Sequence, residues 1–417
     1  MFDTRHSGRR RRPLSGRDQN EAHRTATPLE LLYDLTFVVA FGTAANHLAH
    51  YLAEGHLATA IAGFSIAVLA VVWAWMNYSW FASAYDTDDW LFRIATLLQM
   101  VGVIVWTLGL EELFESLDQG GPIDVRVMVI GYVVMRLPMV VLWSLVARHD
   151  PERAPAAYRY IRTISLAQAG WLTLVLLQLP LWAFVVAGAP LLALELLGPV
   201  MAERHRPTPW NARHIAERHG LLLLITLGES IFGTVSVLDA LVHNEHGWTF
   251  EAGLFAVAGI GLTVSLWWMY FVVPWGDVLA QHRDRSTLWG LGHLVLFGSI
   301  AATGAGLHVA AYFLEDMTKL GPTATVLTVT VPVAIFILAL YTIGSIFLCQ
   351  KDPLHLVLLG GTAGVIILTI AGAALGLSVP WSLLVLAFAP AVTVIAYETV
   401  GHGYLRQALT LKAASDT

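Results

Sequence analysis

Two carboxylates stand at the head of an otherwise apolar stretch, TPLELLYDLTFVVAFGTAANHLAH, at residues 27–50. Glu30 and Asp34 are four residues apart, which is about one helical turn, so both side chains fall on one helix face. An Asp inside a membrane-spanning helix costs about 2.5–3.5 kcal/mol on insertion scales. Such a residue requires a partner, a hydrated cavity or a function, and the chemistry that the pair suits is proton or cation binding.

Glu30 also has a local structural explanation. The segment Thr27-Pro28-Leu29-Glu30 fits a capping box with Pro at the first helical position, in which the Glu30 carboxylate reaches back to the Thr27 amide. Asp34 lies one turn deeper, where no backbone donor is free. We therefore expect Asp34 to be ion-paired or functional. For Glu30, a capping role and a functional role both remain open.

A second set of polar residues lies in HIAERHGLLLLITLGES, residues 214–230. Glu217 and Arg218 come first and are interpreted as a charge cluster at the membrane surface. Glu229 lies eleven residues later, which is about 16 Å along a helix and places it near the membrane midplane. A function and a buried structural hydrogen bond are both open for Glu229, and Gly228 beside it predicts a close helix approach or a kink. Small or polar residues form a stripe at helical spacing: His219, Thr226, Ser230 and Gly233.

Arg136 is the cation expected nearest the midplane. A buried arginine is too costly to stand alone, so we expect it to pair with Asp34, Glu195 or Glu229, in a static or a gating ion pair. His293 is interpreted as a proton-sensitive group facing a cavity. The sequence lacks HisGluxxHis and CysxxCysHis patterns and has one cysteine, so we expect no metal, haem or other cofactor.

These residues require an all-α polytopic membrane protein to position them. The chain of 417 residues is 56% hydrophobic and only 13% charged, with apolar runs of membrane-spanning length along nearly its whole extent. The runs are continuous and do not alternate in polarity, which excludes a β-barrel. We predict twelve transmembrane helices, at residues 28–53, 57–82, 90–113, 124–147, 157–179, 181–203, 213–241, 250–273, 286–314, 323–349, 354–377 and 380–404.

The basic residues predict the orientation. Residues 1–26 hold seven arginines and few apolar residues, as expected for a disordered cytoplasmic tail. With twelve spans, all but three of the 24 Lys and Arg residues fall in this tail, in cytoplasmic loops and helix starts, or in a cytoplasmic C-terminal tail at 406–417. The exceptions are Arg126, Arg136 and Lys319. We therefore expect both termini in the cytoplasm.

The two halves of the chain echo each other. Trp73, Trp75, Met76 and Tyr78 correspond to Trp267, Trp268, Met269 and Tyr270, and Pro180-x-Trp182 corresponds to Pro380-Trp381. We interpret residues 27–205 and 206–405 as tandem six-helix repeats. An even number of helices per repeat would place the copies in the same orientation, related by an axis along the membrane normal.

Several of these motifs also resemble a known family. The blocks ELLYDLTFV at 30–38 and ERHGLLLLITLGES at 217–230, with WWMYF at 267–271 and His293, are similar to the bacterial low-temperature-requirement protein A family. The resemblance covers nearly the whole chain after the tail. It implies an integral protein of the bacterial cytoplasmic membrane, in a family whose molecular activity is not established. Tyr33 stands where the family often has Phe.

The hypothesis that we place first is transport, by a proton- or cation-linked carrier or an ion-conducting protein. Its expected partners are membrane lipids and H⁺ or a monovalent cation, without nucleic acid, and the oligomeric state stays open. Two alternatives are a membrane-embedded enzyme acting on a lipid or isoprenoid through acid and base carboxylates, and a sensor or scaffold for cold or envelope stress. The expected ion or substrate pathway comprises Asp34, Glu229, Arg136, Glu30, Glu217, His219, His293 and Glu195.

Overall fold

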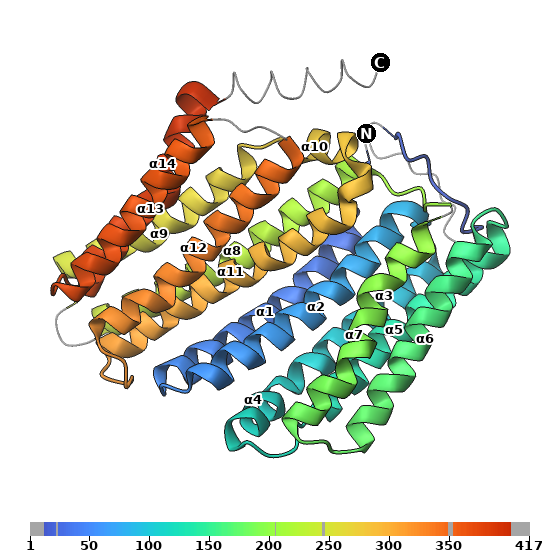
Figure 1. The fold of residues 1–417 in the computed structure, drawn as a ribbon, viewed down its shortest axis with the longest axis horizontal. Helices are drawn as coiled ribbons and strands as arrows, with labels where there is room; N and C mark the ends of the chain where they lie inside the picture. Colours follow the sequence, from blue (N-terminus) through green and yellow to red (C-terminus); the bar gives the residue numbers. More distant parts are fainter. Residues whose placement is uncertain (1–11, 22–23, 205, 244–246, 349–352, 402–417) are drawn as a thin grey trace. The chain divides into compact units, whose positions relative to one another are not determined.

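The computed structural model describes residues 12–21, 24–204, 206–243, 247–348 and 353–401 (Figure 1). The described part is helical, and no strand occurs in it. The chain is an all-α polytopic membrane protein, as the sequence predicts. Its elements are α1 (Pro28–Ala53), α2 (Leu57–Tyr85), α3 (Trp90–Leu108), α4 (Leu110–Gln119), α5 (Arg126–His149), α6 (Ala154–Leu176), α7 (Leu181–Glu203), α8 (Ala212–His243), α9 (Phe250–Phe271), α10 (Trp275–Gln281), η1 (Arg283–Arg285), α11 (Ser286–Leu314), α12 (Pro322–Leu348), α13 (Pro353–Ala374), α14 (Val379–Ala396) and the π-helical η2 (Tyr397–Gly401).

By length and composition, 11 helical segments of the described chain are able to cross a membrane. Together with α6 they correspond to the twelve predicted segments. The α6 helix does not reach the same apolarity because Arg159 and Arg162 lie in its first half. The predicted end of the last helix at residue 404 and the C-terminal tail fall outside the described residues, as do residues 1–11 of the N-terminal tail.

The predicted helix at 90–113 is divided in two. The α3 helix ends at Leu108, and α4 begins at Leu110. Gly109 lies between them, and a Cβ atom at this position would lie only 2.6 Å from the Met128 backbone nitrogen. The helix therefore breaks at a point where the chain passes close to α5.

The chain divides into two compact units, which we describe separately. Unit 1 comprises residues 1–40 and 69–218, so it holds the first half of α1, the second half of α2, α3 to α7 and the start of α8. Within it α3 packs on α5, α5 on α6, and α6 on α7. The α7 helix is peripheral, since only 17% of its most apolar stretch is buried.

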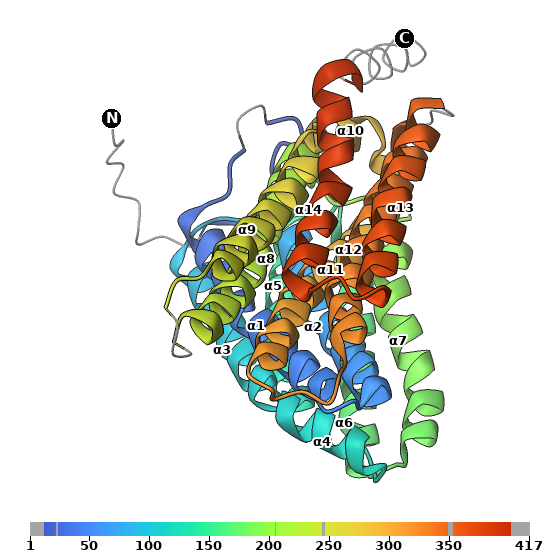
Figure 2. The same ribbon diagram turned by 90° about the vertical axis from the view of Figure 1, so that its left-hand side faces the viewer.

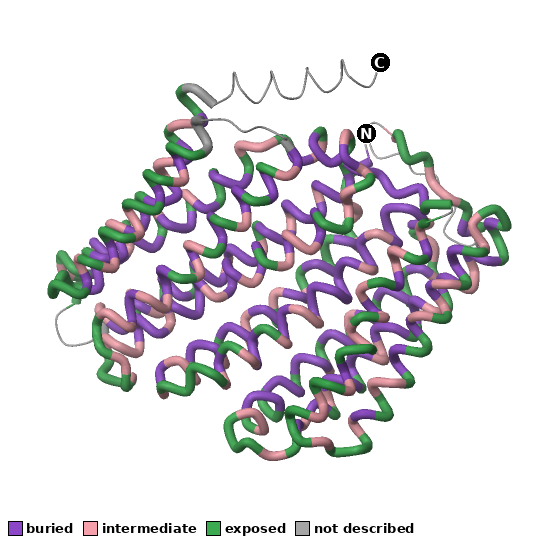
Figure 3. Tube along the Cα trace, viewed as in Figure 1, coloured by how far each residue is buried: buried purple, intermediate pink, exposed green. Residues whose placement is uncertain are grey.

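Unit 2 comprises residues 41–68 and 219–417. Within it α11 packs on α12, α9 on α14, and α13 on α14 (Figure 2). The α11 helix is the most buried span of this unit, with 78% of its most apolar stretch buried, whereas α13 has 22% (Figure 3). The tandem repeat of residues 27–205 and 206–405 stays a prediction.

Candidate functional site

Glu30 closes the capping box that the sequence predicts. The Thr27 amide donates to Glu30 Oε2 at 2.8 Å, and the Glu30 amide donates to Thr27 Oγ1 at 3.3 Å. Two free amides at the start of α1 are satisfied in this way. The second oxygen of Glu30 is left for another partner.

That partner is Arg218, at the end of the unit 1 part of α8. Its Nη1 donates to Glu30 Oε1 at 3.0 Å, while Nε donates to Asp34 Oδ2 at 3.0 Å and Nη2 donates to Asp34 Oδ1. Trp75 Nε1 adds a hydrogen bond of 2.6 Å to Asp34. The side chains of Glu30, Asp34 and Arg218 are fully buried. Asp34 is therefore ion-paired, which is one of the two roles expected for it.

Three further charged or titratable residues surround Glu30 and were not predicted to lie there. Arg24 Nη2 lies 3.5 Å from Glu30 and 3.4 Å from Asp86, and His214 Nε2 lies 3.3 Å from Glu30. Asp86 follows the end of α2, and burial raises its pKa, with Glu30 raising it further and Arg24 lowering it. We call Arg24, Glu30, Asp34, Asp86, His214 and Arg218 the arginine cluster.

Arg218 corrects the interpretation of this region as a surface charge cluster. The side chain is fully buried and lies over the rings of Trp75 and Tyr78, at 5.7 and 5.8 Å from their centroids. Glu217 is half-buried and accepts from the Ala26 amide at 3.4 Å, so it holds the segment before α1. In the sequence, the Asp34 carboxylate inside an apolar helix indicates that a buried cation besides Arg136 is needed.

Arg136 pairs with a carboxylate, as the sequence predicts, and the partner is Glu195. Arg136 Nη2 donates to Glu195 Oε2 at 2.8 Å and to the Tyr132 hydroxyl at 2.7 Å. The same carboxylate accepts from Trp73 Nε1 at 3.1 Å and from Gln168 Nε2 at 2.9 Å. Donors from three other helices of unit 1 thus converge on the peripheral α7, a geometry suited to holding that helix in place.

Glu229 differs from every other buried carboxylate of the described chain. Those at Glu30, Asp34, Asp86, Asp150 and Glu195 each have a hydrogen-bond donor or an ion-pair partner. Glu229 is 4% exposed, and no described residue donates a hydrogen bond to its carboxylate or forms an ion pair with it. An uncompensated buried carboxylate is costly, which makes Glu229 a candidate functional residue.

Two glycines lie against Glu229 within unit 2, Gly42 at the carboxylate and Gly304 at the backbone and Cβ. A Cβ atom at Gly42 of α1 would lie 3.0 Å from Glu229 Oε1, and one at Gly304 of α11 would lie 2.8 Å from Glu229 Cβ. We call the space that Gly42 and Gly304 leave around this side chain the Glu229 niche. The close helix approach predicted at Gly228 is not there, since a Cβ atom at Gly228 meets nothing within 4 Å, and it occurs instead at Gly233 against Gly304.

His219 and His293 come together in unit 2, with ring centroids 5.0 Å apart. His293 Nδ1 bonds to the Trp289 carbonyl at 2.8 Å and Nε2 to the Tyr270 hydroxyl at 2.9 Å. A carbonyl only accepts, so Nδ1 carries the proton, and in the neutral ring Nε2 accepts from Tyr270. The His293 ring is fully buried and packed at 3.9 Å, centroid to centroid, on Trp289, and its interpretation as a proton-sensitive group facing a cavity stays a prediction.

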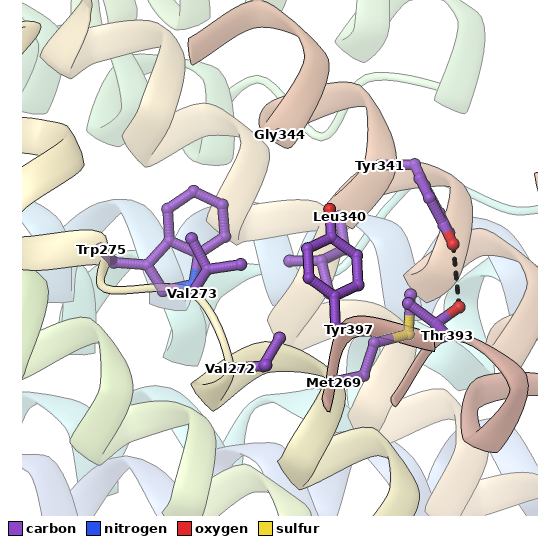
Figure 4. A pocket seen from close by; sticks show the side chains of 9 residues that line it. All are labelled: Met269, Val272, Val273, Trp275, Leu340, Tyr341, Gly344, Thr393 and Tyr397. Carbon is purple, nitrogen blue, oxygen red and sulfur yellow. Dashed lines mark hydrogen bonds between the residues drawn. The ribbon is translucent and has the colours of Figure 1, made fainter. Parts of the chain in front are cut away.

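A pocket in unit 2 lies among α9, α10, α12 and α14 (Figure 4). It holds about 330 Å³ of empty space including its open mouth. The hydroxyls of Tyr341 and Thr393 hydrogen-bond at 2.9 Å on its wall. None of the residues predicted for the pathway lines it. The lining residues are Met269, Val272, Val273, Trp275, Leu340, Tyr341, Gly344, Thr393 and Tyr397.

Comparison with known proteins supports the resemblance seen in the sequence. The sequence model of the bacterial low temperature requirement A protein matches residues 25–390. The uncharacterized protein RA0937 of Rhizobium meliloti (strain 1021) is 25% identical over 312 residues, which are 70% of either chain. No solved structure matches. Because the match spans most of the sequence, this chain belongs to the bacterial low temperature requirement A family.

Proposed function

We propose that this membrane protein transports ions, as a proton- or cation-linked carrier or an ion-conducting protein of the bacterial cytoplasmic membrane. The observation that carries the proposal is the unpartnered Glu229 carboxylate, buried in the middle of a 32-residue helix. A protein that only needed a stable fold would gain by replacing such a group with an apolar one. A site that takes up and releases an ion needs a carboxylate whose charge no fixed cation neutralises.

The two other charge groups have a different role in this proposal. Asp34 and Glu195 are each held by an arginine and by a tryptophan N–H. Charges compensated to this degree are suited to fixing helices in position. Glu229 is therefore the ion-binding group, and the arginine cluster and the Arg136–Glu195 pair are supports.

Flux measurements in proteoliposomes test the proposal. Purified protein is reconstituted, and H⁺, Na⁺ and K⁺ fluxes are followed under imposed gradients. We expect flux above that of empty liposomes, and Glu229→Gln should reduce it to the empty-liposome level while the protein stays monodisperse. Asp34→Asn should instead mainly lower the stability of the protein, because it weakens the pairing with Arg218.

A matched control is Gly364→Ala in α13, where an added Cβ meets nothing within 4 Å. This variant should keep the wild-type flux. The proposal fails if liposomes that contain the wild-type protein show no flux of any of the three ions. It also fails if folded Glu229→Gln gives the same flux as the wild type.

A further inference from the structure

The Glu229 niche is bordered by glycines of two other helices, α1 and α11. A Cβ atom at Gly42 would lie 3.0 Å from Oε1 and 3.4 Å from Oε2, so a larger residue at this position would press on Oε1. Gly304 lets α11 approach the Glu229 backbone, since its Cβ would lie 2.7 Å from the Glu229 carbonyl oxygen. Neither α1 nor α11 therefore carries a side chain at the position where it lies against Glu229.

Glycine offers no side-chain donor to the carboxylate. Two hydroxyls near Glu229 on α8 are already in use, because Thr226 donates to the Leu222 carbonyl and Thr234 to the Ser230 carbonyl. The adjacent Ser230 hydroxyl is buried without a hydrogen-bond partner and does not donate to Glu229 either. Within the described part of the chain, no side chain therefore donates a hydrogen bond to the Glu229 carboxylate. Surroundings of this kind tolerate the neutral acid far better than the anion.

The same geometry bears on which ion binds. A hard metal cation is held by a shell of several oxygen ligands, from carboxylates, carbonyls and waters. Among side chains, the niche supplies a single carboxylate to such a shell, because Gly42 and Gly304 carry no side-chain ligand. A proton, in contrast, needs only one carboxylate oxygen.

We propose that Glu229 is a proton-binding site and that H⁺ is the ion linked to the activity of this protein. The inference rests on the proposed function and narrows it from monovalent cations in general to protons. Proton uptake converts the buried anion into a neutral acid, and proton release restores the anion. The cycle requires no other ligand from the protein.

The helices packed around Glu229 also carry titratable side chains. None of them is joined to its carboxylate by a hydrogen bond or an ion pair in the described structure. On α8 the nearest in sequence are ten residues away in either direction. Within unit 2 the described titratable residues of α1, α8, α9 and α11 are His47, His50, Tyr51, His219, Asp239, Glu251, Tyr270, His293, His308 and Tyr312.

Infrared difference spectroscopy of the full-length protein in lipid nanodiscs tests the inference, with the proton as the probe. Spectra recorded across a pH titration should contain the C=O stretch of a buried carboxylic acid that loses its proton. The band should be absent in Glu229→Gln and displaced in Glu229→Asp. Gly42→Ala should shift it by pressing on Oε1, and Gly364→Ala should leave it unchanged.

The combination with flux separates the two proposals. A Glu229 acid band together with H⁺ flux supports both. A band without any flux supports the proton site and contradicts the transport function. Flux of Na⁺ or K⁺ that needs Glu229, with no acid band lost in Glu229→Gln, keeps the transport function and overturns the proton site. Glu229→Asp and Gly42→Ala also serve if Glu229→Gln fails to fold, because an unshifted band in both overturns the assignment.

Discussion

Arg218 holds Asp34 in a two-point contact, through Nε on one carboxylate oxygen and Nη2 on the other. The remaining terminal nitrogen reaches Glu30, so one guanidinium compensates two buried carboxylates in unit 1. The planar fork of arginine suits this arrangement, whereas a lysine has a single charged nitrogen. The fixed geometry favours a structural role for this part of the site.

The first prediction concerns removal of that cation. Arg218→Met should lower the free energy of unfolding by about 3–5 kcal/mol, because it leaves two buried carboxylates without their main partner. Arg218→Lys should lower it by less, since a charge remains but the two-point contact is lost. Reversible unfolding in mixed micelles measures both.

The triple variant Arg218→Met, Asp34→Asn, Glu30→Gln is the control for this interpretation. It removes the stranded charges and should recover part of the stability lost in Arg218→Met. If the triple variant is less stable than Arg218→Met alone, the loss does not arise from uncompensated charge.

The capping box shows what the sequence could predict. Thr27 and Glu30 lie three residues apart, so their relationship is a property of the first turn of one helix and can be read from spacing alone. The expected midplane position of Glu229 also rests on helix rise alone and stays a prediction. The capping box requires no information about neighbouring helices, because it lies within one helical turn.

Arg136 and Arg218 show which contacts could not be predicted from the sequence alone. The cost of a buried arginine predicts that Arg136 has a carboxylate partner, and three candidates satisfied this condition. Selecting Glu195 requires the packing of α7 in unit 1, over 59 residues of chain. Arg218 lies 184 residues from Asp34, and a position near a helix start does not distinguish a surface charge from one covered by neighbouring helices.

A second prediction concerns the Arg136–Glu195 pair. Glu195→Ala should destabilise the protein by about 3–5 kcal/mol, because Arg136 is then buried without a counter-ion. The double variant Arg136→Met, Glu195→Ala should cost less than the sum of Arg136→Met and Glu195→Ala. A double-mutant cycle on unfolding free energies gives the coupling, expected at about 0.5–3 kcal/mol. Additive single changes would mean that the pair does not hold α7.

Thr27→Ala provides a third prediction. It removes the hydroxyl that accepts from the Glu30 amide, and it should cost about 1 kcal/mol of unfolding free energy. Thr27→Ser keeps the hydroxyl and should cost much less. An equal loss in the two variants would show that the methyl group of Thr27, and not the cap, is responsible.

A fourth prediction concerns pH. Glu54, after α1, and Lys319, before α12, form an exposed ion pair of 2.6 Å in unit 2, and Lys319 holds the pKa of Glu54 below its usual value. A lowered carboxyl pKa means that the contribution is present above the usual carboxyl range and is lost as the pH falls through the lowered value. The stability difference between wild type and Glu54→Gln should therefore shrink on acidification and in high salt. A difference that grows under acid would contradict the pairing.

The last prediction separates packing from charge at Gly304. Gly304→Val should force α8 and α11 apart, because a Cβ at this position already falls 2.7 Å from the Glu229 backbone, and the overpacking should cost about 1–3 kcal/mol or more. Gly364→Val, on an open face of α13, should leave stability within about 0.5 kcal/mol. Thermal loss of the monodisperse peak in detergent ranks the two variants. Equal melting temperatures of Gly304→Val and Gly364→Val would show that α11 does not need to approach Glu229 closely. Gly304 would then not be one of the two residues that define the niche.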